Sequence, residues 1–143
     1  MVRDNTIPDV LLVEDNPGDV RLTREAFRKT EFDVRMHIAT DGIKAIDFLR
    51  DDGSPCPDFV LLDLNLPRKD GLDVLEEIKG DPEMEQLPVL VLSSSTARED
   101  IISSYEKHAN AYLSKPDSHE SFVELVQAVE SFWFDRVRLP PCS

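Results

Sequence analysis

The sequence lacks long apolar runs and contains few cysteines and few basic residues. No apolar stretch approaches the roughly 20 residues that a helix needs to span a bilayer, and the first residues lack the apolar core of a signal peptide. The two cysteines, Cys56 and Cys142, match no metal-ligand or redox spacing, so we expect both to stay reduced and without a chemical role. These absences predict a cytoplasmic protein without a membrane partner.

Basic side chains are outnumbered, because the 143 residues contain 16 Lys and Arg against 29 Asp and Glu, a net charge of −13. No basic stripe is available to contact phosphates, which argues against a nucleic-acid partner. The length suits one domain with a sizeable hydrophobic core. We expect this domain to cover residues 9–135, between an N-terminal tail of residues 1–8 and a C-terminal tail of residues 136–143.

Three short apolar runs are each followed by polar residues. Runs of this length fit strands that are covered on both faces of a parallel sheet, although a buried helix segment has a similar composition. Two further segments, residues 34–38 and 111–114, mix in polar residues, as expected for strands at a sheet edge. The apolar runs and the residues that follow them are 10–13 with Glu14 and Asp15, 59–62 with Asp63, and 89–92 with Ser93.

Helical patterns alternate with these strands along the chain. The strict alternation predicts a doubly wound α/β fold with five parallel strands and five helices. A flavodoxin-like strand order of 2-1-3-4-5 places the three apolar strands in the centre and the two mixed strands at the edges. The helical patterns cover residues 17–29, 43–49, 71–78, 97–107 and 122–133.

The carboxyl ends of parallel strands gather at one edge of the sheet, so Glu14, Asp15, Asp63, Ser93 and Lys115 should meet there. Two carboxylates 4 Å apart repel by roughly 4 kcal/mol at an effective dielectric constant near 20. Protonation with raised pKa values could offset this repulsion. A hard divalent cation is the usual solution, and Mg²⁺ binds through one or two carboxylates while leaving room for a phosphate oxygen. We therefore expect a weak, open Mg²⁺ site.

Asp63 follows the central strand and is the candidate nucleophile, because a carboxylate can attack phosphorus to give an aspartyl phosphate. Mg²⁺, the Lys115 ammonium and the Ser93 hydroxyl would neutralise or hydrogen-bond the phosphoryl oxygens. Each position also has an ordinary interpretation: a helix cap for Asp15, a turn for Ser93 and a solvated strand end for Lys115. Their coincidence at strand ends favours the chemical interpretation.

Several short motifs accompany these strand ends. They are Glu14-Asp15, Asp63-Leu64-Asn65-Leu66-Pro67, Asp70-Gly71, Ser93 and Lys115-Pro116. Together they resemble the receiver domain of a two-component response regulator, over nearly the whole chain. The resemblance implies a regulatory phosphoacceptor rather than an enzyme, whose only reactions are its own phosphorylation and autodephosphorylation.

The resemblance also implies a metal site and a phosphoryl donor. The side chains of Glu14, Asp15 and Asp63 and the backbone carbonyl of Asn65 would bind Mg²⁺. Asp63 would accept its phosphoryl group from the phosphohistidine of a sensor histidine kinase or from a phosphotransfer protein. Glu14 stands where many members carry Asp, a departure that should alter the reach to the metal modestly.

The remaining implied roles concern the transferred group and the switch. Ser93 and Lys115 would contact the phosphoryl group, and the Lys115–Pro116 bond is typically cis in similar proteins. Tyr112 matches the aromatic residue that the family couples to the Ser or Thr at the end of the fourth strand. Its alternative interpretation is an ordinary tyrosine on an edge strand. Phosphorylation would thus change partner binding through Ser93 and Tyr112.

The segment 14–22 and the pair Phe132-Trp133 resemble the phytochrome-associated branch of this family. Members of that branch often dimerise. Phe134, Val137 and Leu139 offer apolar surface for a homodimer through the last helix and tail, although a tail folded back on its own domain explains them equally well.

Two other functions compete with this interpretation. A haloacid-dehalogenase-like phosphatase also uses a strand-end Asp, but Asn65 stands where that chemistry needs a second Asp, and the chain has no room for a cap domain. The acidic pair also precedes the nucleophile. An adaptor that is never phosphorylated would be marked by loss of the acidic residues, which are present.

Overall fold

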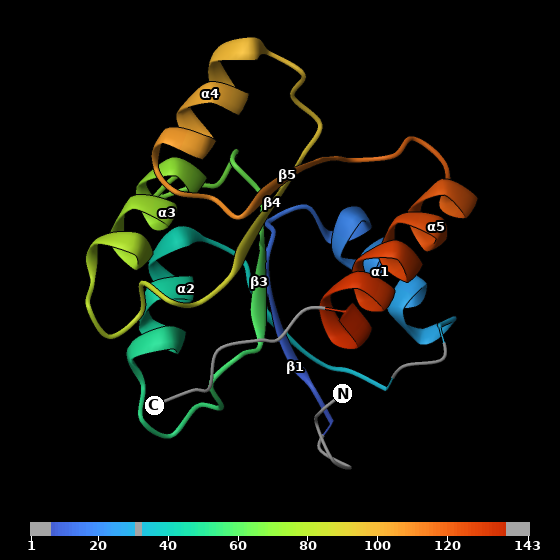
Figure 1. The fold of residues 1–143 in the computed structure, drawn as a ribbon, viewed down its shortest axis with the longest axis horizontal. Helices are drawn as coiled ribbons and strands as arrows, with labels where there is room; N and C mark the ends of the chain where they lie inside the picture. Colours follow the sequence, from blue (N-terminus) through green and yellow to red (C-terminus); the bar gives the residue numbers. More distant parts are fainter. Residues whose placement is uncertain (1–6, 31–32, 137–143) are drawn as a thin grey trace.

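The computed structural model of the chain describes residues 7–30 and 33–136. It contains a parallel sheet of five strands in the order β2-β1-β3-β4-β5 (Figure 1). The predicted strand order is therefore confirmed, and the three apolar strands occupy the centre. The strands are β1 Asp9–Val13, β2 Arg35–Ala39, β3 Phe59–Leu62, β4 Val89–Ser93 and β5 Ala111–Ser114.

Helices cover both faces of the sheet. Figure 1 shows α1 and α5 on one side and α2, α3 and α4 on the other. The helices are α1 Pro17–Arg28, α2 Gly42–Arg50, α3 Gly71–Gly80, α4 Arg98–Glu106 and α5 His119–Glu130.

Side-chain caps begin four of these helices. Asn16, Asp41, Asp70 and Ser118 each accept a hydrogen bond from the backbone N–H three residues later. Such a cap contributes about 1 kcal/mol to helix stability. The α4 helix has no side-chain cap at Ala97. The three caps that follow β1, β2 and β3 fix where α1, α2 and α3 start, close to the carboxyl ends of those strands.

The last helix differs from its prediction at its C-terminal end. The apolar pattern predicts one helix up to Trp133, whereas α5 ends at Glu130 and a π-helix, Ser131–Arg136, follows. A π turn holds more residues than an α turn. Through it, Trp133 packs against Phe59, with ring centroids 6.5 Å apart.

The central strands have a separate apolar core on each face, as their period of two requires. Leu11, Val60 and Val91 point toward α2 and α3. Leu12 and Leu61 belong to the core beneath α1 and α5. The double covering holds β1, β3 and β4 rigidly and so fixes the residues that follow them.

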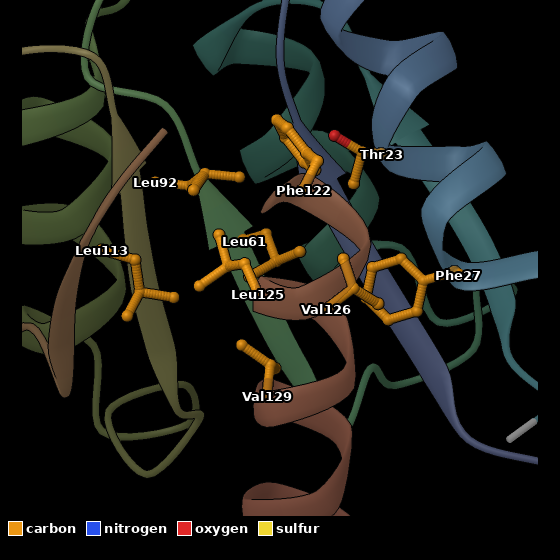
Figure 2. A pocket seen from close by; sticks show the side chains of 9 residues that line it. All are labelled: Thr23, Phe27, Leu61, Leu92, Leu113, Phe122, Leu125, Val126 and Val129. Carbon is orange, nitrogen blue, oxygen red and sulfur yellow. The ribbon is translucent and has the colours of Figure 1, made fainter. Parts of the chain in front are cut away.

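A small apolar cavity of about 10 Å³ lies between α5 and the sheet (Figure 2). Phe122 and Val126 of α5, Phe27 of α1, and Leu61 and Leu92 of the sheet line it. A gap of this size with apolar walls stays dry. It is a packing gap and not a ligand site.

Two expectations concern cysteine and the membrane. Cys56 is disulfide-bonded, so the expectation of a reduced thiol is wrong for this residue, because sequence spacing does not report which sulfur atoms the fold brings together. The other cysteine, Cys142, lies outside the described residues. Within residues 7–30 and 33–136, no helix is both long and apolar enough to cross a membrane.

Most of the surface expected to mediate dimer formation lies outside the described residues. Val137 and Leu139 lie outside the described residues, as does the side chain of Phe134. The homodimer therefore stays a prediction.

Candidate functional site

Two acidic side chains directly follow the neighbouring central strands β1 and β3. The backbone N–H of Asp63 donates to the Val13 carbonyl (3.0 Å), and that of Glu14 donates to the Ala39 carbonyl (3.0 Å). These bonds continue the sheet ladder by one residue beyond each strand. Glu14 is 2% exposed and Asp63 is 7% exposed. The sheet itself therefore presents two buried carboxylates side by side.

Asp15 completes a group of three carboxylates at this edge. One carboxylate oxygen from each of Glu14, Asp15 and Asp63 lies within 4.8 Å of the other two. Asp15 is exposed, whereas the other two side chains are buried. Hard divalent cations prefer oxygen ligands, and a partly open group of carboxylates leaves positions for water. The donor set fits a divalent cation.

The burial of Glu14 beside the other carboxylates changes its pKa. Burial, helped by the nearby charge of Asp63 and opposed by the hydrogen bond from Lys115, raises the pKa of Glu14 to about 7. Both oxygens of Glu14 have partners, since Oε1 lies 2.6 Å from Lys115 Nζ and Oε2 accepts the Asn16 N–H (3.2 Å). Protonation of Glu14 thus relieves part of the repulsion when no cation is bound.

Lys115 brings a positive charge to the carboxylates from the end of β5. Its backbone N–H donates to the Ser93 carbonyl (2.9 Å), which fixes its position beside β4. The Nζ atom lies 2.6 Å from Glu14 Oε1, 2.9 Å from Asp19 Oδ2 and 3.7 Å from Asp63 Oδ2. Burial disfavours the ammonium, but Glu14 and Asp19 outweigh it and raise the pKa of Lys115.

Asp19 is a member of this site that sequence reasoning missed. Its place in the first turn of α1 suggests only a favourable interaction with the helix dipole. That interpretation does not predict the contact of Asp19 with Lys115, 96 residues later in the chain. The signal that could have found it is its position four residues after Asp15, in the first turn of the helix that follows β1.

Ser93 and Tyr112 are linked through the loop between β4 and α4. Ser93 is fully buried, and its Oγ accepts the N–H of Ser95 (3.1 Å). The Tyr112 hydroxyl donates to the Ser95 carbonyl (2.8 Å), and the Ser95 hydroxyl donates to Asp100 of α4 (2.6 Å). Ser95 therefore joins the end of β4 to both β5 and α4.

The loop after β3 passes close to the backbone of Asp63. Gly71 donates its N–H to the Leu64 carbonyl (2.9 Å). A Cβ atom at position 71 would collide with the Asp63 carbonyl oxygen and lie 2.5 Å from Leu64 Cα. Only glycine permits this approach. Asn65 is exposed in the same loop, two residues beyond Asp63.

The expected cis bond between Lys115 and Pro116 is absent. The described residues contain no cis peptide bond, so that expectation is wrong for this structure. The trans form of a bond before proline is favoured by roughly 0.5–1 kcal/mol in the absence of other constraints.

Comparison with known proteins supplies an independent line of argument. A family model described as the response regulator receiver domain matches residues 10–129. The chain is 44% identical over 135 residues to the response regulator Rcp1 of Synechocystis sp., covering 92% of this chain and 92% of that protein.

Two crystal structures extend this likeness to three dimensions. The Mn²⁺-bound form of Rcp1 matches with a TM-score of 0.86 and 43% identity, covering 94% of this chain and 99% of that chain. The phosphorylated cyanobacterial phytochrome response regulator RcpA matches with a TM-score of 0.90 and 38% identity, covering 95% of this chain and 100% of that chain.

Proposed function

The chain belongs to the response regulator receiver family, and on that basis we propose that Asp63 is its phosphoacceptor. The membership confirms the family predicted from the motifs, including the likeness to phytochrome response regulators. It makes the chain a phosphoacceptor of two-component signalling. The observation that supports the assignment to Asp63 is its buried position beside the other two carboxylates and 3.7 Å from Lys115 Nζ.

The proposed reaction transfers one phosphoryl group. An Asp63 carboxylate oxygen forms a bond to phosphorus while the phosphorus–nitrogen bond of a phosphohistidine breaks and the imidazole leaves with the electron pair. The donor is a sensor histidine kinase or a phosphotransfer protein. Lys115 and the Ser93 hydroxyl contact oxygens of the transferred group.

The proposed cofactor is Mg²⁺. Glu14, Asp15 and Asp63, with the backbone carbonyl of Asn65, would hold it, and the close grouping of the three carboxylates supports this assignment. Rcp1 has been crystallised in a Mn²⁺-bound form. When bound, such a cation neutralises negative charge on the acceptor and on the phosphoryl oxygens.

The proposed output is a change in partner binding. The hydrogen bonds that join Ser93, Ser95 and Tyr112 support a switch. In it, a phosphoryl group on Asp63 accepts a hydrogen bond from Ser93 and so disturbs the hydrogen bonds that Ser95 makes to Ser93 and Tyr112. A second copy of the chain, bound through the last helix and tail, is one proposed partner. The cytoplasmic location expected from the sequence is part of the same proposal.

The competing functions predict different behaviour. A phosphatase would release phosphate from its donor through many turnovers, whereas a receiver holds one phosphoryl group until it hydrolyses. The family match over residues 10–129 does not favour the phosphatase. An adaptor that is never phosphorylated would have no use for clustered carboxylates that repel one another.

The test uses phosphoramidate, a small donor with a phosphorus–nitrogen bond. Wild-type protein is incubated with phosphoramidate and Mg²⁺, and its intact mass is measured before and after treatment with hydroxylamine, which cleaves acyl phosphates. We expect one added phosphoryl group that hydroxylamine removes. No labelling, a label that resists hydroxylamine, or donor hydrolysis without an accumulated label would each contradict the proposal.

A further inference from the structure

Asp19 makes one of the two shortest contacts of Lys115 with a carboxylate. Its Oδ2 lies 2.9 Å from Lys115 Nζ, whereas the nearest Asp63 oxygen lies 3.7 Å away. Only 10% of the Lys115 side chain and 31% of the Asp19 side chain are exposed. Little water competes for the pair, so its geometry is better defined than that of a surface ion pair.

The other short contact of Lys115 is to a residue with a second task. Glu14 holds Lys115 at 2.6 Å, but it also belongs to the group of carboxylates that fits a divalent cation. Asp19 does not belong to that group. Of the two carboxylates that hold Lys115 most closely, Asp19 alone has no role toward the metal.

The start of α1 holds Asp19 firmly. The Asn16 side chain accepts the Asp19 N–H (3.1 Å), and the Thr23 hydroxyl donates to the Asp19 carbonyl (2.8 Å). Pro17 occupies the first turn of the helix and restricts its backbone. The carboxylate therefore projects from a rigid base, as a positioning group requires.

The ammonium of Lys115 has three N–H donors. Two are directed to Glu14 and Asp19 by short contacts, which leaves one donor for a group near Asp63, whose Oδ2 lies 3.7 Å from Nζ. A phosphoryl group on Asp63 would bring oxygens closer to the third donor. Lys115 can therefore meet the phosphoryl group without releasing Asp19.

From this geometry we propose that Asp19 is a positioning residue for Lys115. It holds the ammonium beside Asp63, and it continues to do so when a metal ion binds to Glu14. The inference rests on the proposed function, because it assumes that Lys115 contacts the phosphoryl group on Asp63. It adds a residue outside the metal-binding group to the machinery of phosphoryl transfer.

Asp19→Asn tests the proposal, because it keeps the shape of the side chain and removes its charge. Asp73→Asn is the matched control, since Asp73 occupies the same place in the first turn of α3 and its N–H bonds to the cap residue Asp70 (3.0 Å). Both variants lose a carboxylate that favours a helix N-terminus. A merely structural role therefore predicts equal effects for the two variants.

The first measurement is the initial rate of labelling by phosphoramidate at saturating Mg²⁺. We expect Asp19→Asn to be roughly tenfold slower than wild type, within the range seen when a supporting residue of a site is lost, and Asp73→Asn to match wild type. An Asp19→Asn rate equal to wild type overturns the proposal. A faster rate also overturns it, because Asp19 would then restrain Lys115.

The second measurement does not depend on labelling. The ¹H–¹⁵N signal of a lysine ammonium is visible by NMR only when hydrogen bonds protect it from exchange with water. With Mg²⁺ present, we expect the Lys115 signal in wild type and Asp73→Asn and its loss in Asp19→Asn. Retention in Asp19→Asn overturns the proposal. Absence of labelling in wild type would instead contradict the proposed function itself.

Discussion

The two ends of the central sheet both carry charged side chains, but they balance charge differently. At the amino end, Asp9 is paired with Arg35 (3.0 Å) and His37 (2.8 Å), and its N–H donates to Asp58 (2.8 Å). At the carboxyl end, Lys115 lies within 4.0 Å of three carboxylates, and a fourth, Asp15, stands beside them.

This difference separates structural charges from functional ones. The amino end joins β1 to β2 and the loop before β3, and each of its groups has a partner of suitable charge or polarity. The carboxyl end keeps more negative charge than its cation can balance. The raised pKa of Glu14 offsets part of this imbalance, and crowded charges of this kind are typical of a functional site. The comparison therefore supports the proposal that the carboxyl end of the sheet binds a cation and a phosphoryl group.

Replacing the basic side chain at each end of the sheet should give the largest difference in labelling rate. Lys115→Gln should slow labelling of Asp63 by about 10²- to 10³-fold, because one charged donor to the transition state is lost. Arg35→Gln should leave the labelling rate unchanged, since the Arg35 side chain is 57% exposed and lies at the opposite end. Intact-mass kinetics measure both rates. Equal rates for the two variants would remove the functional distinction between the ends.

Alanine substitution at the two ends of α3 tests how tightly the carboxyl end of the sheet is packed, because only Gly71 contacts the backbone of Asp63. Gly71→Ala should lower the free energy of unfolding by roughly 1–3 kcal/mol, because its Cβ collides with the backbone of Asp63 and Leu64. Gly80→Ala has open space around it and should raise stability by up to about 1 kcal/mol. Urea denaturation measures both changes. A neutral Gly71→Ala would show that the loop after β3 is loosely packed.

The pH dependence of stability should report the crowded carboxylates. The folded pKa of Glu14 is about 7, above its usual 4.5, so the folded state holds this proton more tightly than the unfolded state. Without divalent cations, the Glu14 contribution to the free energy of unfolding should therefore fall as pH rises from about 4.5 to about 7, by at most about 3 kcal/mol. Denaturation in the presence of a chelator at several pH values measures the slope.

Two variants and added metal test the source of that slope. Glu14→Gln should flatten it, whereas Glu124→Gln, an exposed carboxylate on α5, should retain it. Because a metal ion competes with the proton for Glu14, stabilisation by Mg²⁺ should grow as pH rises through the same range. Mg²⁺ stabilisation that is independent of pH would argue against Glu14 as a ligand.

The sequence predicts the sheet and the gathering of its strand ends well, for a physical reason. Three apolar runs of four residues, alternating with helical patterns, favour strands of a sheet covered on both faces, and parallel strands bring their carboxyl ends to one edge. Glu14, Asp63 and Lys115 each follow a strand directly, so their proximity follows from topology. The family match then agrees with the motifs that these residues form.

Other features depend on side-chain reach and local packing, which no short motif encodes. Asp19 contributes through its distance to Lys115, and its sequence context suggests only a helix dipole. The disulfide at Cys56, the trans bond before Pro116 and the π turn after Glu130 likewise follow from the assembled fold. The predicted metal ligands stay predictions, of which Glu14 is tested by the pH experiment above. The switch role of Tyr112 also stays a prediction.

The most direct test of the central claim compares phosphorylation at the two ends of the sheet. Wild type, Asp63→Asn and Asp58→Asn are incubated with phosphoramidate and Mg²⁺ and measured by intact mass. We expect one added phosphoryl group on wild type and on Asp58→Asn, and none on Asp63→Asn. Labelling of Asp63→Asn to the wild-type level would contradict the claim.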